Sequence, residues 1–167
     1  GPLLDSHGRV IGVNTAIRSA TGLNSGIGFA VPVNTVKRIV PQIIENGVVQ
    51  YPYLGITSNP AVTLADLAIE FDLPVREGVL IAEALSGGSA ARAGLRGGDE
   101  VVNFRGLEVV LGGDIIVAID GQPIRNFDEL IGYLVSNTEV GQEVVVSILR
   151  DGEAMEVPVT LDARPDN

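Results

Sequence analysis

The sequence of 167 residues contains no cysteine and a single histidine, His7. Without cysteine the chain forms neither a disulfide nor a thiolate metal site. One imidazole is too few for a histidine-based zinc centre, and His7 lies between Ser6 and Gly8 in a turn-like stretch where we expect an exposed side chain rather than a catalytic base. The sequence therefore predicts no metal, no cofactor and no complete hydrolytic site.

Basic clusters and long apolar runs are also missing. The chain has 11 Lys and Arg against 21 Asp and Glu, a formal net charge of -10 at pH 7. Because a phosphate backbone is bound by clustered cations, we expect no nucleic-acid partner. No apolar run approaches the roughly 20 residues of a membrane-spanning helix, so we expect no membrane insertion of this segment.

Apolar residues and glycine, in contrast, are plentiful. Hydrophobic residues make up 46% of the chain, aromatics only 4%, and there are 21 glycines. This balance is typical of short Val, Ile and Leu strands separated by turns. The expected fold is mainly β with some α.

The first 47 residues predict strands followed by a helix. Residues 9–17 are rich in β-branched side chains, with Leu3 and Leu4 as a hairpin partner, and residues 26–32 form another strand. Helical spacing then predicts a helix capped by Asn34, kinked or broken at Pro41 and ended by Gly47. The apolar residues at this spacing are Val36, Ile39, Val40, Ile43 and Ile44.

Residues 48–52 form an expected linker, beyond which short strands alternate with glycine turns. The helices expected there are 64–71, 89–93 and 127–135, the last capped by Asn126, and the strands expected are 54–58, 79–84, 108–111, 115–119, 144–149 and 156–161. Asp151-Gly152 indicates a hairpin turn. The triplet Gly-Gly-Asp occurs at 97–99 and 112–114, and we expect the part between, about 99–113, to be an inserted hairpin of unassigned purpose.

Three segments near the start resemble, in order and spacing, the end of the protease domain in the HtrA/DegP family of trypsin-like serine proteases. They are residues 1–5 (GPLLD), 8–17 (GRVIGVNTAI) and 26–32 (GIGFAVP). The family's nucleophile lies in a Gly-Asn-Ser-Gly-Gly-Pro-Leu-Leu run, so it falls two positions before Gly1. The resemblance implies that no catalytic residue is present and that this chain is proteolytically inert, while its parent is a serine endopeptidase.

The same resemblance implies that part of a substrate pocket remains. Val13, Asn14 and Thr15 would line it, and Gly26, Gly28 and Phe29 would form the opposite wall. Ordinary barrel packing explains these residues equally well.

The second half resembles the PDZ domains of the same family. The resemblance is carried by residues 53–56 (YLGI), 89–95 (SAARAGL) and 113–124 (GDIIVAIDGQPI). It implies a PDZ-type α+β domain at 53–163, preceded at 1–47 by the truncated end of a trypsin-like β-barrel and followed by a tail at 164–167.

The loop of Tyr53, Leu54, Gly55 and Ile56 suits the capture of a carboxylate, because glycine lets successive backbone N–H groups converge on an anion. A peptide would then add as a strand beside Ile56, Thr57 and Ser58. From helical spacing we expect Phe127, Leu130, Ile131 and Leu134 to divide between the groove and the core; Leu130 and Leu134 are favoured for the groove, with core packing as the alternative for each. Many family members carry a basic residue ahead of this loop, whereas here Gln50-Tyr51-Pro52 stands in its place. Internal extended segments are therefore an alternative ligand to free C-termini.

The resemblance implies a regulatory and substrate-recognition role in protein quality control. The expected partners are peptides or unfolded proteins with hydrophobic C-termini, the expected parent is a homotrimer, and the expected location is the periplasm or cell envelope. A stand-alone PDZ scaffold or adaptor without protease activity is the alternative. A third reading, a carboxylate-pair or metal enzyme, is motivated by acids that turns and helix starts also explain: Asp99, Glu100, Asp114, Asp120, Asp128 and Glu129.

Overall fold

The computed structural model describes residues 1–18, 26–59 and 61–165. The chain divides into a first unit, Gly1–Gln50, and a second unit, Tyr51–Asn167. This boundary falls within the segment 48–52, and the assignment of each unit as a domain stays a prediction. No helix among the described residues is long and apolar enough to cross a membrane.

The first unit is an antiparallel sheet followed by a helix. Strands β1 (Pro2–Leu4), β2 (Val10–Ile17) and β3 (Gly28–Pro32) lie in that order, and α1 (Val33–Asn46) follows. The turn between β1 and β2 is held by the Asp5 carboxylate, which accepts the N–H groups of His7 and Arg9, each at 2.9 Å. His7 is exposed in this turn.

Two expectations for α1 are corrected. The helix begins at Val33, so its N-cap position is Pro32 and not Asn34, because the fixed φ of Pro32, -58°, leads directly into helical geometry. The helix also runs through Pro41 without a break, so the expected break into two turns is wrong, while the kink stays a prediction. It ends as expected at Gly47, whose φ of +73° suits a left-handed cap and whose N–H bonds to Ile43.

The second unit is built on a five-stranded sheet. Its order is β11 (Gln122–Pro123), β10 (Ile115–Ile119), β12 (Glu143–Arg150) and β13 (Glu153–Thr160), and β6 (Val79–Leu80) pairs with β10 as well. Asp151 and Gly152 close the β12–β13 hairpin with φ of +52° and +82°, the two left-handed residues of a type I′ turn. The expected hairpin turn is confirmed.

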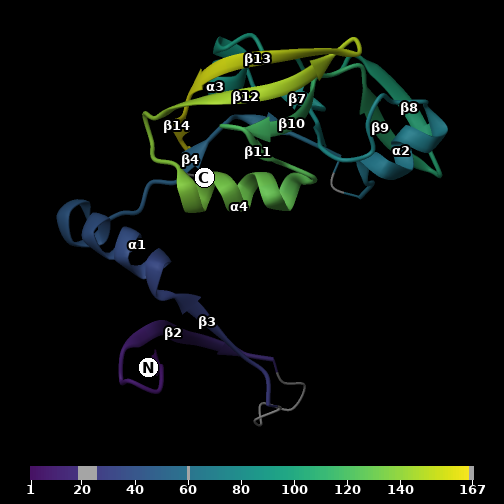
Figure 1. The fold of residues 1–167 in the computed structure, drawn as a ribbon. Coiled ribbons are helices and arrows are strands. Elements are labelled where there is room, and N and C mark those ends of the chain that lie inside the picture. Colours follow the sequence, from purple (N-terminus) through teal and green to yellow (C-terminus); the bar gives the residue numbers. More distant parts are fainter. Residues whose placement is uncertain (19–25, 60, 166–167) are drawn as a thin grey trace. The chain divides into compact units, whose positions relative to one another are not determined.

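Three two-stranded ladders and three helices complete this unit (Figure 1). The ladders pair β4 (Pro52–Tyr53) with β14 (Asp162–Ala163), β5 (Ile56–Thr57) with β7 (Glu83–Ala84), and β8 (Glu100–Phe104) with β9 (Leu107–Leu111). The helices are α2 (Leu64–Glu70), α3 (Ser89–Arg92) and α4 (Phe127–Asn137). The mixed, sheet-rich fold agrees with the expected class.

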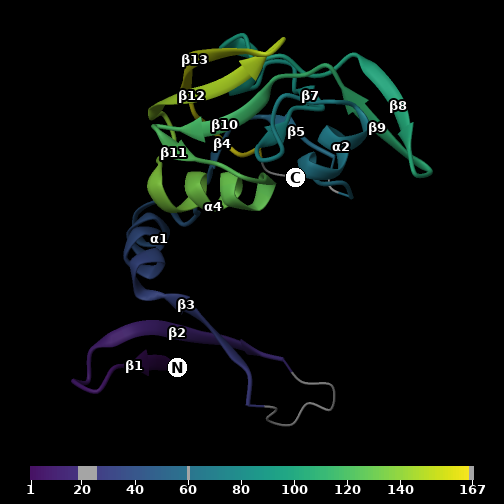
Figure 2. The ribbon, with the colours of Figure 1, turned by 45° about the vertical axis from the view of Figure 1, so that its right-hand side comes forward.

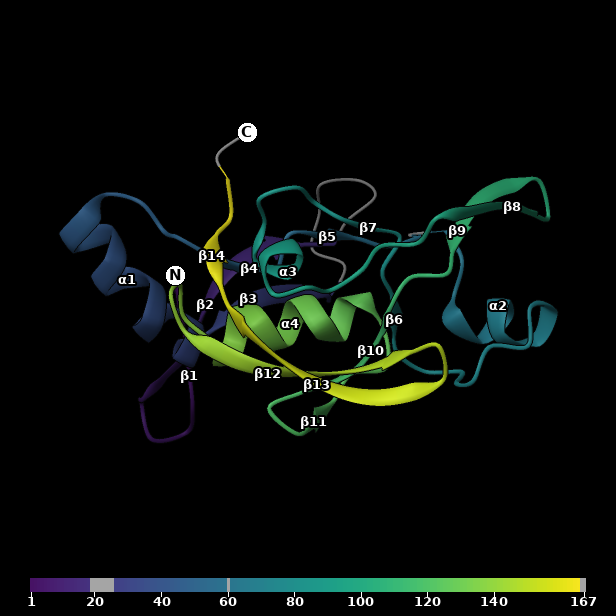
Figure 3. The same cartoon turned by 90° about the horizontal axis from the view of Figure 1, so that it is seen from above.

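Two apolar clusters fill the second unit. The larger joins α4 to the sheet and includes Ile116, Leu130 and Val146. The smaller lies between α2 and the β8–β9 hairpin and includes Leu67, Phe104 and Val109. Figures 2 and 3 show α2 and this hairpin together at one end of the unit, and Figure 3 shows β4 and β14 toward the other.

Candidate functional site

The loop at residues 53–56 is held through its carbonyl groups. The carbonyl of Tyr53 lies 3.2 Å from the Ser89 hydroxyl, that of Leu54 accepts the N–H of Ala90 at 2.8 Å, and that of Gly55 accepts the N–H of Leu85 at 2.8 Å. All three partners lie on α3 or in the segment leading to it. One side of the loop is therefore fixed against the protein.

The N–H groups of the same loop, in contrast to its carbonyl groups, lack hydrogen-bond acceptors among the described residues. None of the hydrogen bonds between described residues uses the N–H of Leu54 or Gly55, although both residues are buried. In the β5–β7 register Ile56 faces Ala84, and the flanking bond from Leu85 to Gly55 makes this a non-hydrogen-bonded pair, so the Ile56 N–H points away from β7. Buried backbone donors are nearly always satisfied, so consecutive free ones indicate a site for an anion.

Gly55 is required by both conformation and space. Its φ is +74°, which L side chains rarely adopt, and a Cβ there would lie 3.2 Å from the Cα of Gly88. The loop consequently sits directly on the residue that precedes α3.

A hydrogen-bond network supports this loop and consists of Ser89, Asp162 and Arg92. The Ser89 hydroxyl lies 2.8 Å from the Asp162 carboxylate, to which Arg92 Nη2 donates at 2.7 and 2.8 Å. Hydrogen bonds from Arg92 and then Ser89 lower the pKa of Asp162. Because Asp162 pairs with Tyr53 across the β4–β14 ladder, the network links the loop to the end of the main sheet.

Strand β5 presents one edge to β7 and leaves the other unpaired among the described residues. Thr57 pairs with Glu83 on the occupied side. Ser58, directly after the strand, lines a cavity together with Phe127 and Asp128 of α4. The free edge of β5 is therefore continuous with an opening beside α4.

The structure corrects which side chains α4 offers to that opening. Leu130 and Leu134 are only 0% and 2% exposed and belong to the main core, because they lie on the helix face turned toward the sheet. The exposed apolar side chains of this helix are Phe127 and Ile131, at 37% and 40%, one turn apart on the same face. Helical spacing places all four side chains on one apolar stripe about 100° wide, so spacing alone does not divide them between groove and core.

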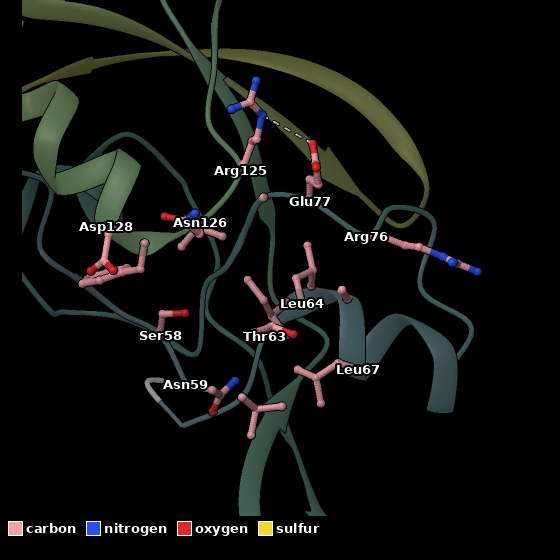
Figure 4. Close-up of a pocket in the computed structure, with 16 residues that line it drawn as sticks. Ser58, Asn59, Thr63, Leu64, Leu67, Arg76, Glu77, Arg125, Asn126 and Asp128 are labelled. Atoms are coloured by element: carbon pink, nitrogen blue, oxygen red, sulfur yellow. Dashed lines mark ion pairs between the residues drawn. The ribbon is translucent and has the colours of Figure 1, made fainter.

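The cavity itself measures about 510 Å³. Figure 4 shows it between Ser58 and Asn59, the start of α2 at Thr63 and Leu64, and the start of α4 at Asn126 and Asp128. We call it the upstream cavity. Sequence reasoning missed it because its walls come from four separate segments.

The expected pocket remnant of the first unit lies on β2 and β3. Val13 and Asn14 face Val31 and Ala30 across this pair, and the Thr15 hydroxyl donates to the carbonyl of Phe29 at 3.2 Å. Gly28 begins β3 and Gly26 precedes it. Their role in a substrate pocket stays a prediction.

Two of the acids that motivated an enzymatic reading, Asp114 and Asp120, have structural partners. The buried Asp114 binds Arg150 at 2.7 Å, and this hydrogen bonding raises the pKa of the Arg150 guanidinium. Asp120 accepts the N–H of Val145 at 2.8 Å and lies 3.3 Å from the Tyr133 hydroxyl. Within the described residues no three acidic or imidazole side chains gather as metal ligands would.

Comparison with known proteins gives concordant results at the level of the family. The PDZ domain family matches residues 106–161. The chain is 39% identical over 166 residues to "Protease Do-like 1, chloroplastic" of Arabidopsis thaliana, covering 99% of this chain and 35% of that protein. It is 36% identical over 162 residues to the periplasmic pH-dependent serine endoprotease DegQ of Escherichia coli (strain K12), covering 97% and 32%. The chain spans about a third of the length of these curated relatives.

Solved structures agree. The HtrA-type protease AlgW with a decapeptide is similar with a TM-score of 0.72 and 30% identity, covering 100% of this chain and 46% of that one. AlgW with a tripeptide gives a TM-score of 0.68 and 31% identity, covering 100% and 50%. The chain thus carries a PDZ domain and is homologous, along nearly its whole length, to the PDZ-containing part of HtrA/DegP-type serine proteases.

Proposed function

We propose that the second unit binds the C-terminal end of an extended apolar peptide. The observation that supports this proposal is the run of N–H groups at Leu54, Gly55 and Ile56, which have no hydrogen-bond acceptor among the described residues. The carbonyl groups of Tyr53, Leu54 and Gly55, in contrast, all accept hydrogen bonds. A terminal carboxylate supplies the acceptors that these donors lack, and an ionised acceptor strengthens each bond.

The rest of the peptide adds to the free edge of β5. The N–H and C=O of Ile56 face this edge, so an antiparallel peptide strand continues the two-stranded ladder by main-chain hydrogen bonds. Phe127 and Ile131 face the incoming side chains from α4. In this arrangement Leu130 and Leu134 stabilise the helix from the core.

We further propose that the parent protein is a serine endopeptidase in which this chain supplies substrate recognition and regulation. Support comes from relatives named as serine endoproteases and from the similarity to the HtrA-type protease AlgW, which covers the whole of this chain. Several of those names include the periplasm, which favours an extracytoplasmic location. The chain by itself is proposed to be proteolytically inert, and a trimeric parent stays a prediction from resemblance.

The test is a titration of the full chain, followed by backbone NMR shifts, with two peptides that share a hydrophobic last residue. One ends in a free carboxylate and the other in an amide. We expect the amide shifts of residues 54–56 to move with the carboxylate peptide and its affinity to be at least tenfold higher, since charge-assisted hydrogen bonds contribute about 1.5–3 kcal/mol.

Equal binding of the two peptides would contradict capture of the C-terminus and would favour recognition of internal extended segments. Binding of neither would contradict the peptide-binding proposal and favour a scaffold that uses other surfaces.

A further inference from the structure

The upstream cavity lies beyond the end of β5, in line with the proposed peptide groove. Ser58 and Asn59 continue the strand into its wall, and Phe127 belongs both to the exposed face of α4 and to the cavity lining. A strand added along β5 therefore arrives at this cavity (Figure 4). The following inference rests on the peptide-binding function proposed above.

The inner wall of the cavity is apolar and firmly supported. Leu64, Leu67 and Leu80 line it and are themselves buried in the smaller core against Phe104 and Val109 of the β8–β9 hairpin. Thr63 caps α2, its hydroxyl accepting the N–H of Asp66 at 3.2 Å. A wall that is already packed from behind is preformed for a ligand.

Asn59 ties the strand side of the cavity to the same hairpin. Its side-chain amide donates to the carbonyl of Val110 at 3.3 Å and accepts the Val110 N–H at 3.4 Å. The inserted hairpin thus supports two walls of the cavity, at α2 and at Asn59. This gives the insertion a purpose that its sequence does not reveal.

Charges at the mouth of the cavity are balanced. Arg125 lies 3.8 Å from Glu77 and 3.4 Å from Glu129, and Figure 4 shows the Arg76 side chain extending away from the other lining residues. Asp128, in the first turn of α4, also lines the cavity, so the lining carries two arginines and two acids and has no excess of either charge. An uncharged side chain suits this interior better than an acidic or basic one.

The length of α4 sets the distance between the two ends of the groove. Its 11 residues extend about 16 Å at about 1.5 Å per residue. An extended peptide covers that distance in about five residues at about 3.3 Å each. A tripeptide anchored at residues 54–56 extends only as far as Ser58 at the rim of the cavity, because Ser58 follows Ile56 by two residues, whereas a peptide of seven or eight residues extends across the cavity.

We infer that the upstream cavity is a second specificity site, which takes a large aliphatic side chain of the bound peptide about four to six residues before its C-terminus. Leucine, isoleucine and methionine have the size and chemistry to fill it. The protein then recognises the peptide at two points, its carboxylate and this upstream side chain, and the edge of β5 binds the main chain between them.

The test uses the full chain and free-carboxylate peptides measured by isothermal titration calorimetry. The set is a tripeptide and octapeptides with the same last three residues, in which leucine is placed in turn at each upstream position in a serine background. We expect leucine at one position in the four-to-six window to bind roughly tenfold more tightly than the all-serine octapeptide, as burial of one aliphatic side chain provides.

Two variants close or polarise the cavity, and one is a matched control. Ala65→Phe fills it and Val62→Asp places a charge on its apolar wall, since both residues line it. Ile69→Phe changes the same helix at an exposed position outside the lining. We expect the first two to abolish the leucine effect without weakening the tripeptide, and Ile69→Phe to keep it, with thermal unfolding checking that each variant folds.

The outcomes separate the two proposals. Tripeptide binding without any leucine effect, or a leucine effect that survives both cavity variants, overturns the second site and leaves carboxylate capture intact. Failure of every peptide to bind overturns both.

Discussion

The two units differ in how they use their apolar residues. In the second unit apolar side chains form two buried clusters, whereas in the described part of the first unit Gly12 alone is buried. The first unit nevertheless exposes large apolar side chains on every element, among them Leu4, Ile11, Phe29 and Ile44. The strands of the first unit are paired, but pairing alone does not make this unit stable by itself, because the burial of apolar side chains is confined to the second unit.

Amide hydrogen exchange should give the largest contrast between the units. Strand β12, with Val144, Val146 and Ile148 buried, should open only with global unfolding, whereas β2 should open locally. We expect protection of β12 to exceed that of β2 by roughly a thousandfold, which corresponds to about 4 kcal/mol. Equal protection in a dilute monomer would contradict the comparison.

Substitutions on α4 should separate its core face from its groove face. Leu130→Ala should lower the free energy of unfolding by about 2–5 kcal/mol because it leaves a cavity in the main core. Ile131→Ala should change stability far less and should instead weaken peptide binding. Urea unfolding and calorimetry on both variants provide the measurement, and a reversed pattern would restore the sequence-based assignment of the groove.

Removing one partner of the buried Asp114–Arg150 ion pair should lower the free energy of unfolding more than removing one partner of an exposed pair. Asp114→Ala leaves Arg150, whose side chain is 16% exposed, without its partner, and should cost about 3 kcal/mol of unfolding free energy. Glu77→Ala is the matched control, since the Glu77–Arg125 pair is exposed and should contribute at most about 1 kcal/mol. Similar urea midpoints for both variants would show that burial does not set the strength of this pair.

Gly55→Ala should act on binding as well as on stability. The new Cβ adopts a strained φ and presses on Gly88, so the loop must shift and its N–H groups lose their common direction. We expect a loss of at least tenfold in affinity for the carboxylate peptide. Gly141→Ala has the same φ sign with nothing within 4 Å of the added carbon, so it should cost only local strain and leave affinity unchanged.

The smallest effect expected is on the acid dependence of stability. The pKa of Asp162 is lowered in the folded protein, so its carboxylate stabilises the fold above the ordinary value of 3.8 and loses this contribution as pH falls through the folded pKa. The side chain is 41% exposed, which limits the effect. Asp162→Asn should flatten the curve of stability against pH below about 4; an unchanged curve would show that the network adds no pH dependence.

Local signals were sufficient for one turn and for two of the helix caps. Asn126, Gly47 and the Asp151-Gly152 turn each act through neighbours within four residues, and the structure confirms all three. The start of α1 was wrong because Pro32 and Asn34 both suit a helix start and propensity did not rank them.

The candidate site was harder to predict for a physical reason. Helix α4 has one broad apolar stripe, and only its contact with the sheet decides that Leu130 at one edge of the stripe is buried while Ile131 at the other edge is exposed. The upstream cavity and the Ser89–Asp162 contact join segments up to 73 positions apart, which no local spacing reveals.

The loop at residues 53–56 offers main-chain donors, so apart from the requirement for Gly55 its capacity to bind an anion does not depend on side-chain chemistry. Every residue except proline supplies the same N–H, so substitutions at Leu54 or Ile56 change the packing around the donors but do not delete them. Sequence drift can therefore alter which side chains are preferred next to the loop while its capacity to receive a negative group persists. Proline at either position is the one replacement that would remove a donor outright.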